Sequence, residues 1–126
     1  MVIPVGQPKI VLVVDDDAAI LKIIKKQLEV EGYAVLCEST GTAALEAVKN
    51  TQLLAVLLDL RLGDMDGFEV LKQIKAVKPT LSVIMITGCH EEEEARKAFQ
   101  VGAWDYVTKP IDFVYLKNIL LLQSLE

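Results

Sequence analysis

Long apolar runs, basic clusters and paired cysteines are all scarce in this sequence of 126 residues. Its apolar runs are far shorter than the roughly 20 residues of a membrane-spanning helix, so no membrane span is expected. The net charge is −5 with no offsetting Lys/Arg run, and direct nucleic-acid binding, which relies on neutralising phosphates, is not expected. Two cysteines, Cys37 and Cys89, cannot build a disulfide framework, and they lack the CxxC spacing of a metal site. A reducing cytoplasm fits these absences.

The composition is that of a folded protein, with 52% apolar and 25% charged residues. The length suits a single domain. Residues 1–9 contain Pro4 and Pro8 and lack the charged start and apolar centre of a signal peptide. We therefore expect residues 1–9 to be a flexible N-terminal tail and residues 10–126 to form one domain.

Short apolar segments rich in β-branched residues alternate with longer amphipathic segments. Runs without polar alternation are typical of strands buried on both faces of a parallel sheet, and Cys37 is accordingly expected in the core. The expected strands are Ile10–Val14, Tyr33–Cys37, Leu54–Leu58, Leu81–Ile86 and Trp104–Thr108.

Helical spacing of apolar residues marks the segments between these strands. Ile20, Ile24 and Leu28 recur every four residues before Gly32, which is expected to end that helix. Further helices are expected over Thr42–Asn50, from Phe68 to before Pro79, over Glu91–Val101 before Gly102, and after Asp112 as N-cap. Five strands alternating with five helices predict a doubly wound α/β domain with helices on both faces of the sheet.

Polar residues follow four of the five expected strands. They are Asp15–Asp17 after the first strand, Asp59 after the third, Thr87 after the fourth and Lys109 after the fifth. In an open α/β sheet, ligands bind beyond the carboxyl ends of the strands. Taken singly, each residue could be a turn residue or a helix cap. Their joint occurrence at one edge of the sheet favours a functional site.

The chemistry of this edge suits a hard divalent cation and a phosphoryl group. Clustered carboxylates repel one another unless a cation intervenes, and Mg²⁺ prefers oxygen ligands, with Mn²⁺ as an alternative. Asp59 is then a candidate nucleophile, because a carboxylate can accept a phosphoryl group whose charge is neutralised. Lys109 and Thr87 would contact the phosphoryl oxygens.

Several motifs together resemble the response-regulator receiver domains of bacterial two-component signalling. The matching stretches are VLVVDDD (Val11–Asp17), LLDLRLGDMDGFEVL (Leu57–Leu71), VIMITG (Val83–Gly88) and GAWDYVTKP (Gly102–Pro110). The resemblance implies a flavodoxin-like (βα)5 fold with strand order 2-1-3-4-5. It also implies a phosphorylated signalling switch rather than an enzyme, although such a domain assists its own phosphotransfer and dephosphorylation.

The same resemblance implies a role for each site residue. Asp59 would accept a phosphoryl group from a histidine kinase or a phosphotransfer histidine. Asp16 would ligate Mg²⁺ directly, Asp15 largely through water, and Asp59 and the backbone carbonyl of Arg61 would complete the protein ligands. Thr87 and Lys109 would contact the phosphoryl oxygens, and Tyr106 would change rotamer together with Thr87. Lys109–Pro110 is expected to be a cis peptide.

Some residues around these motifs call for other interpretations. Many relatives carry Pro where this chain has Gly63, so the loop Leu62–Gly67 is expected to be more flexible here. By resemblance, Cys89 and Arg61 occupy positions that tune access of water to the acyl phosphate. His90 is interpreted as an exposed loop residue, and Glu91–Glu94 as a solvated helix start favoured by the helix macrodipole.

The last expected helix is apolar nearly all round, whereas a surface helix needs one apolar stripe. Its apolar residues are Phe113, Val114, Tyr115, Leu116, Ile119, Leu120, Leu121, Leu122 and Leu125. This surplus suggests contact with a partner, a second copy or a downstream helix. It supports an output surface formed by the fourth helix, fifth strand and fifth helix, which the coupled movement of Thr87 and Tyr106 would change. A truncated linker helix is the simpler alternative.

Two other functions compete with the phosphorylation switch. A phosphorylation-independent pseudo-receiver would use the same fold as an interaction module, but it would be expected to lack some of the site residues. A flavodoxin-like enzyme or nucleotide binder would need a GxGxxG or GxxxxGK[ST] loop after the first strand, and neither is present. Stand-alone and multidomain organisation, with an output domain downstream, both remain open.

Overall fold

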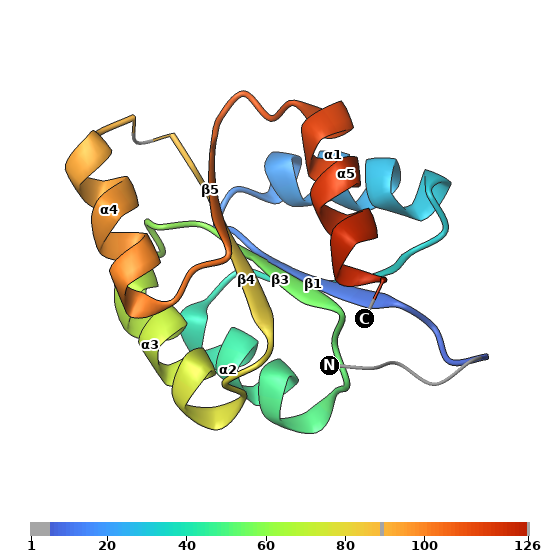
Figure 1. Ribbon diagram of the computed structural model, residues 1–126, viewed down its shortest axis with the longest axis horizontal. Coiled ribbons are helices and arrows are strands. Elements are labelled where there is room, and N and C mark those ends of the chain that lie inside the picture. The colour runs from blue at the N-terminus through green and yellow to red at the C-terminus, as the bar shows by residue number, and fades with distance from the viewer. Residues whose placement is uncertain (1–5, 89, 126) are drawn as a thin grey trace.

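A computed structural model of the chain describes residues 6–88 and 90–125. Five parallel strands form one sheet in the order β2-β1-β3-β4-β5 (Figure 1), which confirms the expected fold. The strands are β1 (Ile10–Val14), β2 (Ala34–Glu38), β3 (Ala55–Leu58), β4 (Ser82–Thr87) and β5 (Asp105–Thr108). Their bounds differ from the expected ones by a residue or less at each end.

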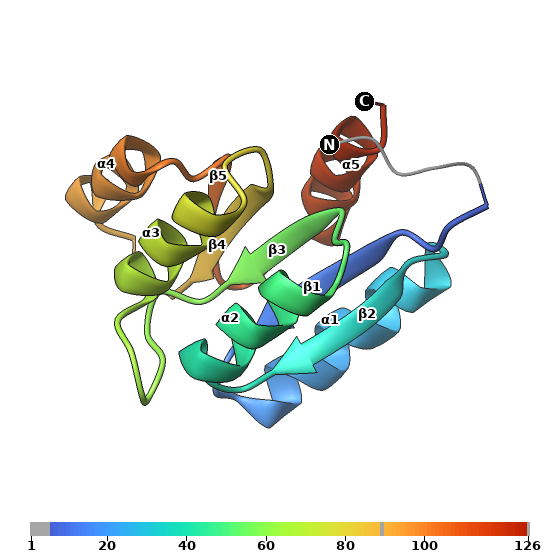
Figure 2. The same cartoon turned by 90° about the horizontal axis from the view of Figure 1, so that it is seen from below.

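In the described part of the chain, four helices connect the strands, a fifth follows β5, and together they cover the sheet on two sides (Figure 2). They are α1 (Ala18–Val30), α2 (Gly41–Asn50), α3 (Gly67–Val77), α4 (Glu92–Val101) and α5 (Phe113–Gln123). Helices α1 and α5 pack on one face, and α2, α3 and α4 pack on the other. The expected arrangement, with helices on both faces, is confirmed.

The alternation of side chains along each strand separates two apolar cores. Leu12 and Val14 of β1 face α2 and α3, whereas Val11 and Val13 face α1 and α5. The core beneath α2, α3 and α4 also contains Ile74 of α3, and the core beneath α1 and α5 contains other buried side chains of those two helices. Because helices cover both faces of the sheet, polar side chains that bind a ligand can reach solvent at the ends of the strands.

The central strands are buried on both faces, but the edge strand β2 is not. All four residues of β3 are buried, whereas Ala34 is exposed and Leu36 keeps 37% of its surface. Cys37 is half-buried, so its assignment to the core was wrong. The strand β2 lies at the edge of the sheet and pairs with one strand only. An apolar run in such a strand therefore does not show that helices cover both of its faces.

Helix ends follow the expected capping chemistry. The Asp17 side chain accepts hydrogen bonds from the amides of Ala19 and Ile20 at the start of α1. The Asp112 side chain does the same for Val114 and Tyr115 at the start of α5. Gly102 ends α4 with φ +116°, a left-handed conformation that side chains disfavour. Gly32, with φ +94°, follows the end of α1. Glu91 is the N-cap residue of α4 without a side-chain cap, and Glu91–Glu93 are solvent-exposed.

The segment before β1 is described only from residue 6. Residues 6–9 lie in no helix or strand, and the Lys9 carbonyl already accepts the Ala34 amide at 3.0 Å. Residues 1–5 lie outside the described residues, so the extent of a flexible tail and the domain limits stay predictions. Among the described residues, no helix has both the length and the apolarity to cross a bilayer.

Candidate functional site

Sheet register places Asp15 and Asp59 side by side. Val14 and Leu58, the last residues of β1 and β3, are register partners, and each is followed by one of the two carboxylates. The Asp59 amide donates to the Val14 carbonyl at 2.9 Å, which extends the pairing past the strand end. Asp15 and Asp59 retain only 3% and 6% of their surface. Two carboxylates are therefore held close together and largely out of water.

The Lys109 ammonium group bridges these two carboxylates. Its Nζ lies 2.8 Å from Asp15 Oδ2 and 3.1 Å from Asp59 Oδ2. Lys109 follows β5, and its amide donates to the Thr87 carbonyl at 2.8 Å, which fixes its backbone beside β4. The Lys109–Pro110 peptide is cis, as expected. The structure thus joins the ends of β1, β3 and β5 through one cation.

Asp16 completes a cluster of three carboxylates. One oxygen from each of Asp15, Asp16 and Asp59 lies within 4.8 Å of the others, and Asp16 is exposed. Backbone amides hold the two buried carboxylates in place, since Asp15 Oδ1 accepts from Asp17 at 2.9 Å and Asp59 Oδ1 accepts from Arg61 at 3.3 Å. Three hard oxygen donors without His or Cys are the ligand chemistry that Mg²⁺ prefers.

A pocket of about 590 Å³ opens at this cluster. Its lining combines anionic, cationic and hydroxyl groups, and the residues are Asp16, Asp59, Arg61, Thr87, Gly88, His90, Glu91 and Lys109. His90 is exposed, as expected, and the structure also places it on the pocket wall. The interpretation of Cys89 lies outside the described residues. The pocket gives a ligand access to Asp59 from solvent.

Burial and neighbouring charges shift two pKa values at the site. Burial and the adjacent Asp15 carboxylate raise the pKa of Asp59, although the Arg61 amide and Lys109 act in the opposite direction. Burial alone would lower the pKa of Lys109, but its hydrogen bonds to Asp15 and Asp59 outweigh this effect and raise it. Lys109 therefore stays cationic near neutral pH, and Asp59 ionises less readily than an exposed aspartate.

Thr87 and Tyr106 lie on the same face of the sheet. Met85 pairs with Tyr106 and Thr87 pairs with Thr108, so the two-residue alternation of strands puts Thr87 diagonally next to Tyr106. Thr87 is buried at the pocket, and the half-buried Tyr106 packs on the core beneath α2, α3 and α4. The pair links the pocket to the side of the sheet that α4 covers.

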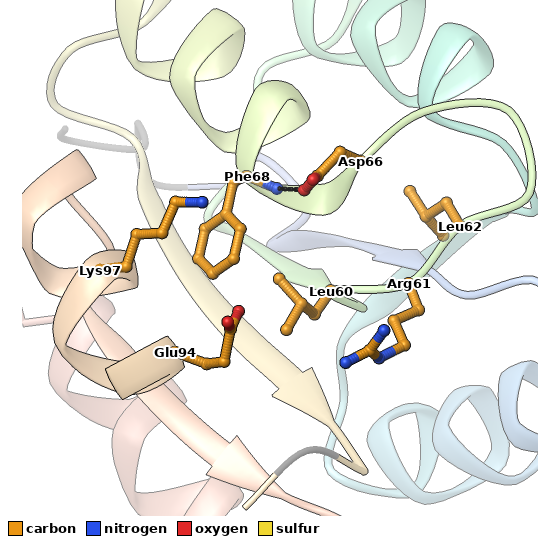
Figure 3. Close-up of a pocket in the computed structure, with 7 residues that line it drawn as sticks. All are labelled: Leu60, Arg61, Leu62, Asp66, Phe68, Glu94 and Lys97. Atoms are coloured by element: carbon orange, nitrogen blue, oxygen red, sulfur yellow. Dashed lines mark hydrogen bonds between the residues drawn. The ribbon is translucent and has the colours of Figure 1, made fainter. Parts of the chain in front are cut away.

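A second pocket, of about 400 Å³, lies between the β3–α3 loop and α4 (Figure 3). Lys97 reaches from α4 across to Phe68, with its Nζ 4.3 Å from the ring centre. Leu60, Arg61 and Leu62 form the opposite wall. Arg61 lines both pockets. The loop that begins beside Asp59 therefore also borders the pocket that α4 helps to form.

The surface formed by α4, β5 and α5 exposes large apolar side chains. Phe99 of α4 and Trp104 before β5 are exposed. Four apolar residues of α5 and one that follows it are exposed as well: Val114, Tyr115, Leu121, Leu122 and Leu125. Leu116, Ile119 and Leu120 are buried against the sheet. The expected surplus of apolar residues on this helix is therefore found on its exposed side.

Asp64 is a structural participant that the sequence patterns did not reveal. Its carboxylate accepts hydrogen bonds from the amides of Gly41 and Thr42 and from the Thr42 hydroxyl, at 2.8, 3.1 and 3.0 Å. These bonds lower the pKa of Asp64, the Gly41 amide most strongly. The partners are distant in sequence, and only the fold brings them together. No local signal could have indicated this contact.

Comparison with known proteins shows which family the chain resembles. A family model described as the response regulator receiver domain matches residues 11–121. The transcriptional regulatory protein ZraR of Escherichia coli is 40% identical over 110 residues, which cover 87% of this chain and 25% of ZraR. The chain thus spans about a quarter of the length of the curated relatives it first matches.

Solved structures show the same fold. The crystal structure of a CheY-like response regulator receiver domain protein from Methanospirillum hungatei has 34% identity and a TM-score of 0.86, covering 94% of this chain and 98% of that one. A response regulator protein from Burkholderia pseudomallei has 26% identity and a TM-score of 0.83, covering 89% and 66%. The latter structure contains a phosphorylated aspartic acid, a calcium ion and citrate.

Proposed function

This chain belongs to the response-regulator receiver-domain family of two-component systems, and from that premise we propose that Asp59 accepts a phosphoryl group in a Mg²⁺-dependent reaction. The observation that carries the proposal is the convergence on Asp59 of Lys109 from β5 and of Asp15 and Asp16 from the end of β1. A histidine kinase or a phosphotransfer histidine would supply the phosphoryl group in the cytoplasm.

The residues present fit a magnesium ion. Asp16 would ligate it directly, Asp15 largely through water, and Asp59 and the Arg61 carbonyl would supply the remaining protein oxygens. Few protein ligands suffice, because Mg²⁺ usually keeps several waters. When bound, the ion would neutralise negative charge on the phosphoryl oxygens. Mn²⁺, which accepts similar ligands, could replace it.

The side chains of the pocket can carry out the transfer. One carboxylate oxygen of Asp59 attacks phosphorus as the P–N bond of the donor phosphohistidine breaks, and the electron pair of that bond leaves with the imidazole. The product is an acyl phosphate on Asp59. Lys109, 3.1 Å from Asp59, and the hydroxyl of Thr87, which lines the same pocket, would contact the phosphoryl oxygens. Hydrolysis by water restores the Asp59 carboxylate.

The consequence of phosphorylation would be a change on the surface of α4, β5 and α5. A phosphoryl group adds about −1.5 to −2 charges, and it shifts a conformational equilibrium only if one state binds it better. Thr87 would move toward it, and Tyr106, its diagonal neighbour, would take up the space that Thr87 leaves. The exposed apolar side chains of this surface would then contact an output domain, a partner protein or a second copy of the chain.

The transcriptional regulators among the relatives make an output in transcription the natural inference. This domain would act there through protein contacts, since its net charge of −5 is unfavourable for binding nucleic acid directly.

The alternative is a pseudo-receiver that works without phosphorylation. It would need no phosphoacceptor chemistry, yet Asp15, Asp16, Asp59, Thr87 and Lys109 all surround one pocket or the ion pair at its base. We therefore favour the phosphorylated switch, and labelling separates the two functions directly.

The test is incubation with acetyl phosphate, with Mg²⁺ or with excess EDTA, followed by intact-mass measurement. The expected result is the gain of one phosphoryl group in the presence of Mg²⁺ only. Asp59→Asn should abolish the gain, and Asp66→Asn, at an exposed acid of the same loop, should retain it. Absence of labelling with every donor and metal would favour the pseudo-receiver.

A further inference from the structure

We propose that Asp64 is a positioning residue for the metal site, because it fastens the loop that carries Arg61 to the start of α2. The proposal rests on the proposed function, since it concerns the same magnesium site. Asp64 itself touches neither Asp59 nor the pocket around it. Its effect would pass through the backbone of the loop from Arg61 to Asp66.

The contact between Asp64 and α2 uses both carboxylate oxygens. Oδ1 accepts the Gly41 amide at 2.8 Å, and Oδ2 accepts the Thr42 amide at 3.1 Å and the Thr42 hydroxyl at 3.0 Å. The first amides of a helix have no partner within the helix, and a negative charge is favoured there. The Thr40 hydroxyl accepts a hydrogen bond from the Ala43 amide. Asp64 therefore accepts hydrogen bonds from the two first amides of the helix that Thr40 leaves uncapped, those of Gly41 and Thr42.

Close packing supports the same attachment. A Cβ atom built on Gly41 would lie 2.7 Å from Val70 Cγ2 of α3 and 3.0 Å from Met65 Sδ of the loop. The absence of a side chain at Gly41 therefore lets the start of α2 approach both the loop and α3. Asp64 and Met65, adjacent in sequence, hold α2 by hydrogen bonds and by van der Waals contact respectively.

The base of the loop is fixed separately, next to Asp59. Arg61 and Asp66 form an antiparallel bridge, and the Gly67 amide donates to the Leu60 carbonyl at 2.9 Å. The Arg61 amide donates to Asp59 Oδ1, so the residue whose carbonyl would bind the metal is tied to the phosphoacceptor. Between these base contacts, the described hydrogen bonds from the loop tip to other elements come from Asp64.

Gly63 makes this attachment important. It lies between Arg61 and Asp64, and no atom beyond its two chain neighbours lies within 4 Å of a Cβ built on it. A glycine has more backbone conformations to lose than any other residue. Without the Asp64 contact, the segment from Leu62 to Met65 would sample other conformations, and the orientation of the Arg61 carbonyl would become variable. Metal ligands depend on such supporting contacts, whose loss typically weakens binding about 10–100-fold.

The experiment compares Mg²⁺ affinity, measured by titration calorimetry, between the wild-type chain, Asp64→Ala and Thr40→Ala. Thr40→Ala is the matched control, because it also removes a cap from the start of α2 but leaves the loop attached. We expect Asp64→Ala to bind Mg²⁺ about tenfold more weakly, whereas Thr40→Ala keeps wild-type affinity. Both variants should lose stability in urea, so stability alone cannot produce the difference.

Asp64→Asn separates position from charge. It removes the same negative charge but keeps an oxygen that can accept the Gly41 amide, so it should recover most of the lost affinity. Amide hydrogen exchange supplies a second measurement, and it should become faster over residues 62–65 in Asp64→Ala.

Wild-type affinity and unchanged loop exchange in Asp64→Ala would overturn this inference while leaving the proposed function intact. Equal weakening in Asp64→Asn and Asp64→Ala with unchanged loop exchange in both would also overturn it, because the lost charge, and not a loosened loop, would then be the cause. Failure of the wild-type chain itself to bind Mg²⁺ would overturn the proposed function and the inference with it.

Discussion

Replacing Lys109 by methionine would leave two buried carboxylates without their shared cation. Methionine keeps much of the apolar stem of lysine but cannot donate a hydrogen bond. The Lys109 Nζ atom lies 2.8 Å from Asp15 Oδ2 and 3.1 Å from Asp59 Oδ2, and those two side chains expose only 4% and 8% of their surface. The substitution should therefore destabilise the metal-free domain strongly.

The expected loss is about 3 kcal/mol at pH 7. Removing one partner of a buried ion pair costs about 3–5 kcal/mol, because the remaining charge is left unpaired in a poorly hydrated place. The lower value is appropriate, since the Lys109 side chain is itself 23% exposed and water can replace part of its contact. At about 4 °C per kcal/mol for a chain of this length, the midpoint of thermal unfolding should fall by about 12 °C.

The assay is urea unfolding in EDTA, with Lys117→Met as the matched control. Lys117 pairs with Glu31 at 3.4 Å, but the two side chains are 47% and 37% exposed, so the loss should be about 0.2–1 kcal/mol. Asp59→Asn added to Lys109→Met should restore much of the stability, because one of the unpaired charges is then absent. A loss with Lys109→Met no larger than with Lys117→Met would show that the Lys109 ammonium group does not stabilise the two buried carboxylates.

Three further predictions concern stability. The pKa of Asp59 is raised in the folded domain, so the stability of the metal-free wild-type chain falls as Asp59 loses its proton. Metal-free Asp59→Asn should therefore have the same free energy of unfolding as wild type below the unfolded carboxyl pKa of about 3.9. It should become progressively more stable than wild type as pH rises through the folded pKa, as measured by urea unfolding at several pH values. Gly102→Ala should lose about 1–3 kcal/mol, because Gly102 has φ +116° and a Cβ there would lie 3.3 Å from Lys75 Cε. Leu116→Ala should cost about 2–5 kcal/mol in the α5 core, whereas Leu121→Ala, on the exposed side, should stay within about 0.5 kcal/mol by thermal unfolding.

The sheet and its helices could be predicted because their signals are local. Apolar runs such as Ile10–Val14 and cap residues such as Asp17, Asp112 and Gly102 specify structure within a few positions of themselves. The exposure of β2 could not be predicted in the same way. It depends on which strand lies at the edge of the sheet, and the Tyr33–Cys37 run looks the same in either position.

The site was predictable to the extent that strand ends meet at one edge of the sheet. Asp15, Asp16, Asp59 and Lys109 do converge there, because the residues before them are aligned in register. The attachment of Asp64 to Gly41 was not predictable, since it joins the β3–α3 loop to the start of α2, and the distance between them depends on the packing of α2 against α3. Sequence patterns identify groups that carry chemistry more readily than groups that hold a backbone in place.

Reductive trapping identifies the residue that carries the phosphoryl group, which we expect to be Asp59. An acyl phosphate is reduced by borohydride to an alcohol, which converts the modified aspartate into homoserine, whereas a free carboxylate does not react. After incubation with acetyl phosphate and Mg²⁺, borohydride treatment and peptide mass mapping, we expect homoserine at position 59 and unmodified Asp15 and Asp16. Homoserine at another aspartate, or at none while the intact mass shows the phosphoryl gain, would contradict it.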